Sequence, residues 1–166
     1  MSAYYYAAGQ KVTLEPDEQH VAVDRTAAKG AGLDARIGAT VVAAAVRAGA
    51  DVLVTPRASL TADVIKQLQD AGALQPVYKY NQATVVAMPE VRVEFDTPEQ
   101  RQSVKDLLSS KTSDVEITED TPDRMVLRPV SGRGEDALSL ANRIHENASP
   151  AAVSPRFVQF VPRPKT

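Results

Sequence analysis

Cysteine is absent from the 166 residues of the chain. This absence excludes disulfide bonds, thiolate nucleophiles, iron–sulfur clusters and thiolate zinc sites. Long apolar runs are also missing: the longest block, residues 40–50, is interrupted by Arg47 and falls short of the roughly eighteen residues that a membrane helix needs. The sequence therefore predicts no membrane-spanning segment.

A charge excess of one sign is absent too. Nineteen basic residues stand against twenty-one acidic ones, and the formal net charge is -2. Such a balance gives no long-range field that would draw the chain onto nucleic acid or an anionic membrane. The sequence therefore predicts neither as a partner. The apolar share of 43% and the charged share of 24% are those of a chain that folds and buries a core.

The residue patterns of known catalytic and cofactor sites are missing as well. Only two histidines are present, and no serine lies in a G-x-S-x-G turn. Gly30, Gly32 and Gly38 follow neither the dinucleotide-binding nor the P-loop spacing. The acids are scattered, or gather in residues 119–123 without the spacing of a calcium loop. We therefore expect no enzymatic activity, no catalytic residue, no metal site and no cofactor, and we interpret the tyrosines at 4–6 as packing residues.

The second half of the chain shows a regular order of elements. Apolar and charged residues alternate over residues 91–95, as in a strand with one buried face. Thr97, Pro98 and Gln100 form the pattern of a capping box, which predicts that a helix begins there. Similar patterns predict strands near 115–117 and 125–127, a helix over 135–147 and a strand over 153–161. The order β-α-β-β-α-β is that of ferredoxin-like folds, an α+β class with antiparallel sheets and helices on one face.

The first half repeats this order less clearly. The patterns predict a strand over 20–24, one helix over 33–48 that Gly49 ends, a strand over 51–55, a helix that begins at Thr61 and ends before Gly72, and a strand over 76–80. One middle strand is missing or very short. We therefore expect two ferredoxin-like subdomains, a degenerate one over residues 1–88 and a second over 89–161, and an extended tail over 162–166.

Several stretches resemble the prodomains of bacterial subtilisin-like serine proteases. They are L-Q-P-V-Y-K-Y from Leu74 running into V-R-V-E-F at Val91, the ending A-L-S-L-A-N-R-I-H-E-N-A with A-A-V-S-P-R-F-V-Q-F, and the opening Y-Y-Y with G-Q-K-V-T-L. Residues 1–166 do not include the catalytic domain that accompanies such a prodomain. The chain is then either an excised prodomain or a free-standing inhibitor, similar to a cytoplasmic one in myxobacteria. We expect the free-standing, cytoplasmic case, because the chain starts at a methionine without an export signal.

The resemblance implies an inhibitor, and a folding chaperone, of a subtilisin-like serine protease with which it forms a heterodimer. It implies that the sheet face packs on the protease and that the C-terminal strand enters the active-site cleft. The cleft-binding residues would be Phe157, Val158, Gln159, Phe160, Val161, Pro162 and Arg163. The acids that would cap the protease helices are Glu119, Asp120 and Asp123, since carboxylates are favoured at helix N-termini.

A second interpretation belongs to another functional class. Paired ferredoxin-like units also occur in regulatory modules that sense small molecules. In that case residues 30–38 would form the ligand loop. A screen of small molecules for thermal stabilisation separates the two interpretations, because a bound ligand stabilises the folded state by mass action.

Overall fold

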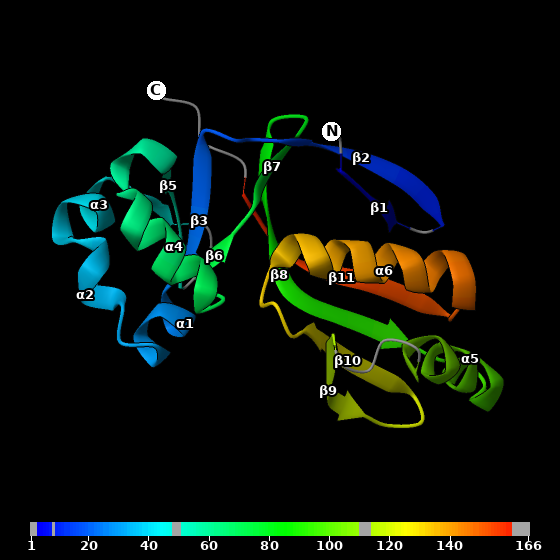
Figure 1. Cartoon of the computed structure of the whole chain (residues 1–166). Coiled ribbons are helices and arrows are strands. Elements are labelled where there is room, and N and C mark those ends of the chain that lie inside the picture. The colour runs from blue at the N-terminus through cyan, green and yellow to red at the C-terminus, as the bar shows by residue number, and fades with distance from the viewer. Residues whose placement is uncertain (1–2, 8, 48–50, 110–113, 161–166) are drawn as a thin grey trace. The chain divides into compact units, whose positions relative to one another are not determined.

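The computed structural model describes residues 3–7, 9–47, 51–109 and 114–160, and it has an α+β fold with antiparallel sheets (Figure 1). The chain divides into two compact units. Unit 1 contains Leu14–Ala87, and residues 157–160 group with it. Unit 2 contains Tyr4–Thr13 and Met88–Arg156. Residues 4–13, which the sequence assigned to the N-terminal subdomain, therefore group with unit 2.

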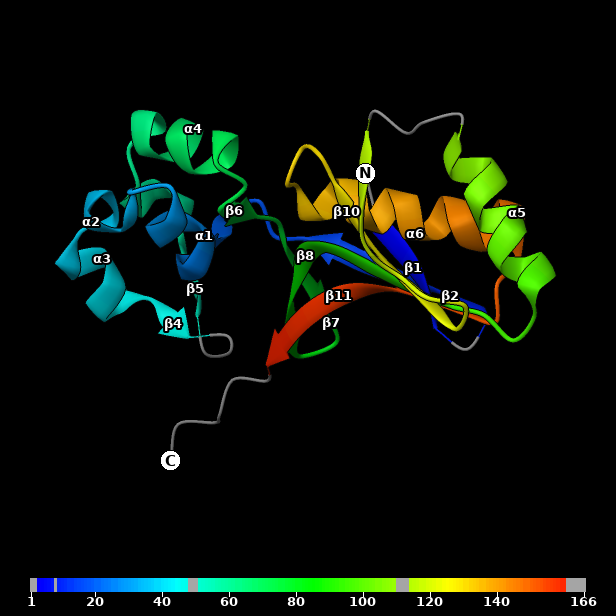
Figure 2. The same ribbon diagram turned by 90° about the horizontal axis from the view of Figure 1, so that it is seen from below.

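From β8 onward, unit 2 has the element order β-α-β-β-α-β, as the sequence predicted. Its elements are β8 (Ala83–Glu94, whose first residues belong to unit 1), α5 (Pro98–Ser109), β9 (Val115–Asp120), β10 (Arg124–Pro129), α6 (Gly134–Ala148) and β11 (Ala152–Phe160). The strands lie in the order β9, β10, β8, β11, and the pairs β10–β8 and β10–β9 are antiparallel. Figure 2 shows the strands in front of α6.

One face of this sheet forms the core of unit 2. Val91 and Val93 of β8 and Leu127 of β10 are 0% exposed, and they pack with Val104 of α5 and Ile144 of α6. Side chains on a strand alternate between the two faces, so both helices must cover the same face. The residues that alternate with these apolar positions point to the opposite face of the sheet.

The start of α5 follows the sequence prediction closely. Thr97 Oγ1 accepts a hydrogen bond from the backbone N–H of Gln100 at 3.2 Å. In return, Gln100 Oε1 accepts one from the backbone N–H of Asp96 at 2.7 Å. The side chain at the third helical position thus reaches one residue further back than in the standard capping box. The first bond satisfies an amide that the helix itself leaves free, and the second satisfies the amide of Asp96, which precedes the helix.

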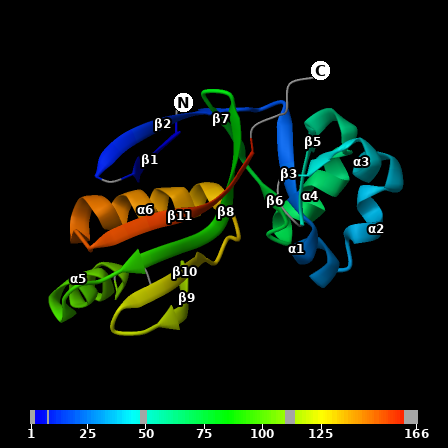
Figure 3. The ribbon, with the colours of Figure 1, turned by 180° about the vertical axis from the view of Figure 1, so that it is seen from behind.

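A hairpin from the N-terminal region covers the outer side of α6 (Figure 3). Its strands are β1 (Ala3–Ala7) and β2 (Gln10–Pro16). The Tyr6 ring stacks on His145 with centroids 4.1 Å apart, and the Tyr6 hydroxyl donates to Glu146 Oε2 at 2.7 Å. This hydrogen bond raises the pKa of Tyr6 to about 12. Asn142 Nδ2 donates to the backbone carbonyl of Tyr4 at 2.7 Å. The packing role expected for the tyrosines is confirmed for Tyr4 and Tyr6.

Unit 1 contains a second, smaller sheet in the order β4, β5, β3, β6. Its elements are β3 (His20–Asp24), α1 (Arg25–Gly30), α2 (Asp34–Ile37), α3 (Ala39–Ala44), β4 (Val46–Arg47), β5 (Val52–Pro56), η1 (Arg57–Ser59), α4 (Ala62–Asp70) and β6 (Leu74–Gln75). Thr61 caps α4 through a hydrogen bond from the N–H of Val64, as predicted. Among the described residues, no helix is both long and apolar enough to span a bilayer.

The single helix predicted over 33–48 is wrong. Two short helices, α2 and α3, take its place, because Gly38 adopts φ +89° and ψ 139°, a conformation that no α-helix contains. Near the end of the predicted helix, Val46 and Arg47 form the strand β4. This is the middle strand that the sequence predicted to be missing or very short. Gly49, the predicted end of the helix, lies outside the described residues. The strand that completes this sheet is β6, whereas β7 (Val77–Tyr80) pairs with β2 and β8.

Candidate functional site

The C-terminal strand β11 contains four of the seven residues predicted for the protease cleft. Phe157 and Val158 are half-buried, Gln159 is exposed, and the described strand ends at Phe160. Pairing with β8 holds β11 in the sheet. The other three predicted residues, Val161, Pro162 and Arg163, lie outside the described residues.

The predicted acidic turn lies at the connection between β9 and β10. Asp120 is the last residue of β9, and its carboxylate is held by two cations of α5. Arg101 Nη2 donates to Asp120 Oδ1 at 2.7 Å, and Lys105 Nζ lies 3.3 Å from Oδ2. The hydrogen bond from Arg101, followed by that from Lys105, lowers the pKa of Asp120 below its ordinary value of 3.8. Asp120 is therefore already paired within the chain.

The other two acids of this turn differ from each other. Glu119 accepts a hydrogen bond from Arg124 Nη2 at 2.6 Å, and this bond raises the pKa of the arginine. Asp123 is exposed, and its backbone carbonyl accepts from the N–H of Phe95 at 2.9 Å. The acids were predicted from the sequence, but the cations that pair with them were not. The spacing of Arg101 and Lys105, four residues apart on one helix face, was the available signal.

The sheet face of unit 2 that points away from the helices carries a balanced set of charges. Alternation with the buried residues places four arginines and four glutamates there: Arg92, Arg124, Arg128, Arg156, Glu90, Glu94, Glu116 and Glu119. Opposite charges face each other across the strands. Arg124 lies opposite Glu94, Arg128 lies opposite Glu116, and Arg156 Nη1 is 3.7 Å from Glu90 Oε2. We call this set the polar sheet face.

Unit 1 contains a small polar cluster around His20. His20 Nδ1 lies 2.9 Å from Asp17 Oδ2, and Lys79 Nζ lies 4.0 Å from the same oxygen. Lys79 also donates to Thr84 Oγ1 at 2.8 Å. Because Thr84 is only 2% exposed, its hydroxyl is not accessible to a substrate carbonyl. The cluster is typical of a structural network rather than of an activated nucleophile.

Residues 30–38, the ligand loop of the second interpretation, border a shallow hollow of about 350 Å³. Arg25 and Asp34 lie at its edge and bind each other through Nε at 3.2 Å and Nη2 at 3.3 Å. The hydrogen bond from Arg25 lowers the pKa of Asp34. The charged groups at this hollow are thus occupied by each other, which leaves little polar capacity for a ligand.

Comparisons with family models, with curated proteins and with solved structures find no match to this chain. Within residues 3–7, 9–47, 51–109 and 114–160, no group of three or more potential ligand side chains is placed to hold a metal ion. The function of the chain is therefore inferred from the geometry of β11, of the acidic turn and of the polar sheet face.

Replacing Asp120 with asparagine should lower the free energy of unfolding at neutral pH by up to about 1 kcal/mol, because a partly exposed ion pair contributes on that scale. The folded-state pKa of Asp120 is depressed, so its contribution is present above the unfolded value of 3.8 and is lost as the pH falls through the folded value. The difference between variant and wild type, measured by urea denaturation, should therefore shrink upon acidification. Asp123→Asn in the same turn is the matched control. A difference that stays constant with pH would contradict this account.

Proposed function

We propose that the chain is a protein inhibitor of a subtilisin-like serine protease, and that the two form a heterodimer. In this proposal both units are ferredoxin-like. The polar sheet face of unit 2 packs on the protease, and β11 with the residues after it enters the active-site cleft. The chain contributes no catalytic group and acts by occupying the site of another enzyme.

The observation that carries the proposal is the topology of unit 2. Its β-α-β-β-α-β order, its strand order β9, β10, β8, β11 and its two helices on one face are the arrangement that the resemblance to subtilase prodomains implies. In this arrangement one sheet face remains for a partner. The last strand contains Phe157 to Phe160, which the resemblance assigns to the cleft.

The charge of the polar sheet face also bears on the proposal. A face with four arginines and four glutamates has no large apolar patch, and it suits a chain that folds alone and binds later. Charges at the rim of an interface mainly affect the association rate and partner choice. Binding to the protease should therefore depend on ionic strength.

The proposal is tested by inhibition assays with a chromogenic peptide. Purified chain is added to a panel of subtilisin-like proteases and, as a matched control, to chymotrypsin-like serine proteases. Both groups use the same catalytic triad on unrelated folds, so a generic substrate-like effect would act on both. We expect inhibition within the subtilisin-like group alone, with a dissociation constant of about 1 μM or lower for at least one member, which corresponds to about -8.2 kcal/mol. Equal behaviour of the two groups would refute the proposal.

A further inference from the structure

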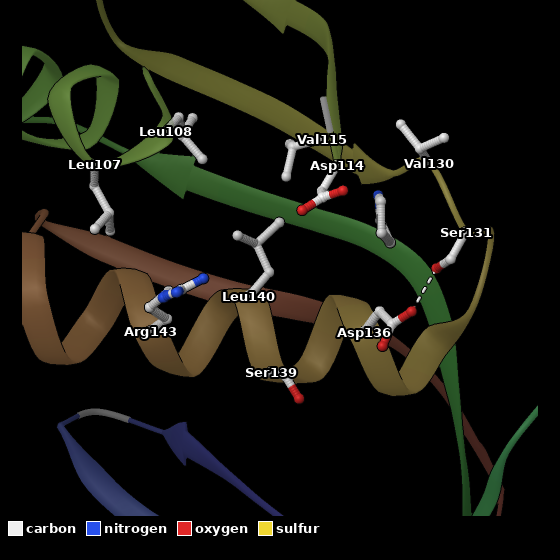
Figure 4. A pocket seen from close by; sticks show the side chains of 11 residues that line it. Leu107, Leu108, Asp114, Val115, Val130, Ser131, Asp136, Ser139, Leu140 and Arg143 are labelled. Atoms are coloured by element: carbon white, nitrogen blue, oxygen red, sulfur yellow. Dashed lines mark hydrogen bonds between the residues drawn. The ribbon is translucent and has the colours of Figure 1, made fainter. Parts of the chain in front are cut away.

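Unit 2 contains a cavity of about 500 Å³ that the proposed function does not use (Figure 4). It lies between the end of α5, the middle of α6 and the residues that flank β9 and β10. Its inner wall is formed by Leu107, Leu140 and Val115. On their other side, these three side chains pack against the core of the unit. Val130 lies at its edge with 65% of its surface exposed. The volume is within the range of small-molecule sites.

Two opposite charges line this cavity from opposite walls. Figure 4 shows Arg143 extending from α6 and Asp114 extending from the start of β9, with Leu140 between them. Within the described part of the chain, neither side chain takes part in a hydrogen bond or an ion pair, whereas Arg101 and Arg124 of the same unit are each paired with an acid. A third charge, Asp136, accepts a hydrogen bond from the Ser131 hydroxyl at 2.6 Å.

We propose that this cavity binds a small zwitterion with an aliphatic body, namely an aliphatic amino acid or a short peptide of such residues. The guanidinium of Arg143 binds the ligand carboxylate, for which its paired donors are well suited. The carboxylate of Asp114 binds the ligand ammonium group. The aliphatic body packs against Leu107, Leu140 and Val115, where burial contributes about 25 cal/mol per Å² of apolar surface.

The charge pattern selects a zwitterion over other apolar ligands. Arg143 is half-buried and Asp114 is exposed, so a neutral ligand would pack on the apolar wall and gain no attraction from either charge. A ligand with only a carboxylate would pair with Arg143 alone, and one with only an amine would pair with Asp114 alone. A ligand that carries both charges satisfies both walls of the cavity.

The test is isothermal titration calorimetry of the full chain without any protease, so its outcome is independent of the proposed inhibitor function. The probes are L-leucine and the dipeptide leucyl-leucine. Isocaproate, which lacks the amine, and isoamylamine, which lacks the carboxylate, are the comparison ligands. We expect at least one zwitterion to bind, and both singly charged compounds to bind at least about tenfold more weakly. Binding of leucine alone identifies an amino acid as the ligand, and binding of the dipeptide alone identifies a peptide.

Variants at the two charges complete the test. Arg143→Met and Asp114→Asn should each weaken zwitterion binding at least about tenfold. Arg133→Met, at the start of α6 and outside the cavity lining, is the matched control and should bind as the wild type does. Circular dichroism melting checks that each variant is folded. The inference is overturned if neither zwitterion binds, if isocaproate or isoamylamine binds as tightly as the zwitterion, or if folded Arg143→Met and Asp114→Asn bind like the wild type.

Discussion

Replacing Ile144 with alanine should lower the free energy of unfolding by about 2–5 kcal/mol. Ile144 is 0% exposed and packs in the core of unit 2 with Val91, Val93 and Leu127. The substitution removes buried methyl and methylene groups and leaves a cavity that close-packed neighbours fill only in part. A loss of this size is a large fraction of the stability of an ordinary domain.

Urea denaturation followed by circular dichroism measures this loss. Val130→Ala is the matched control, because it removes an apolar side chain of similar size from a position that is 65% exposed. Its effect should remain within about 0.5 kcal/mol. If Ile144→Ala and Val130→Ala destabilised the chain equally, α6 would not bury the face that the structure assigns to the core.

The fold of unit 2 was predictable from the sequence because its local signals agree with one another. Alternation over residues 91–95 marks one buried strand face, and Thr97 with Gln100 marks the helix start. Buried large side chains such as Leu127 and Ile144 strengthen the periodic pattern. When propensity, capping and pattern agree, the local sequence is enough to place the elements.

Unit 1 was harder to predict because its signals conflict. Alanine and valine over residues 39–46 satisfy a helical period, but Gly38 is free to adopt φ +89° and interrupts it. A strand of two residues such as β4 has too few positions to show a period of two. Sheet partners depend on tertiary contacts as well, so the sequence could not show that β6, rather than β7, pairs with β3.

The candidate site was predictable only in part, for a related reason. The acids Glu119 and Asp120 stand out in a turn, but their pairing with Arg101, Lys105 and Arg124 requires α5 and the two strands to be in place. Two of the three proposed helix caps are thus engaged within the chain. Among these acids, exposed Asp123 needs the least rearrangement to meet a helix N-terminus of a partner.

Deleting residues 158–166 should raise the inhibition constant for the target protease at least about tenfold, a loss of about 1.4 kcal/mol. In the proposed complex these residues pair along the substrate cleft, so their removal abolishes main-chain hydrogen bonds to the protease. The inhibition assay described above measures the change. The sheet face of unit 2 stays intact, and residual binding through it should therefore remain.

A second deletion separates binding from folding, because Val158 is half-buried in β11 and its loss could destabilise the chain. Removal of residues 161–166 leaves the described strand from Ala152 to Phe160 complete. This shorter deletion should melt at the temperature of the full chain and still weaken inhibition, since Val161, Pro162 and Arg163 are among the predicted cleft residues. If both deletions inhibit as well as the full chain, the C-terminal strand does not occupy the cleft, and the sheet face alone must account for any inhibition.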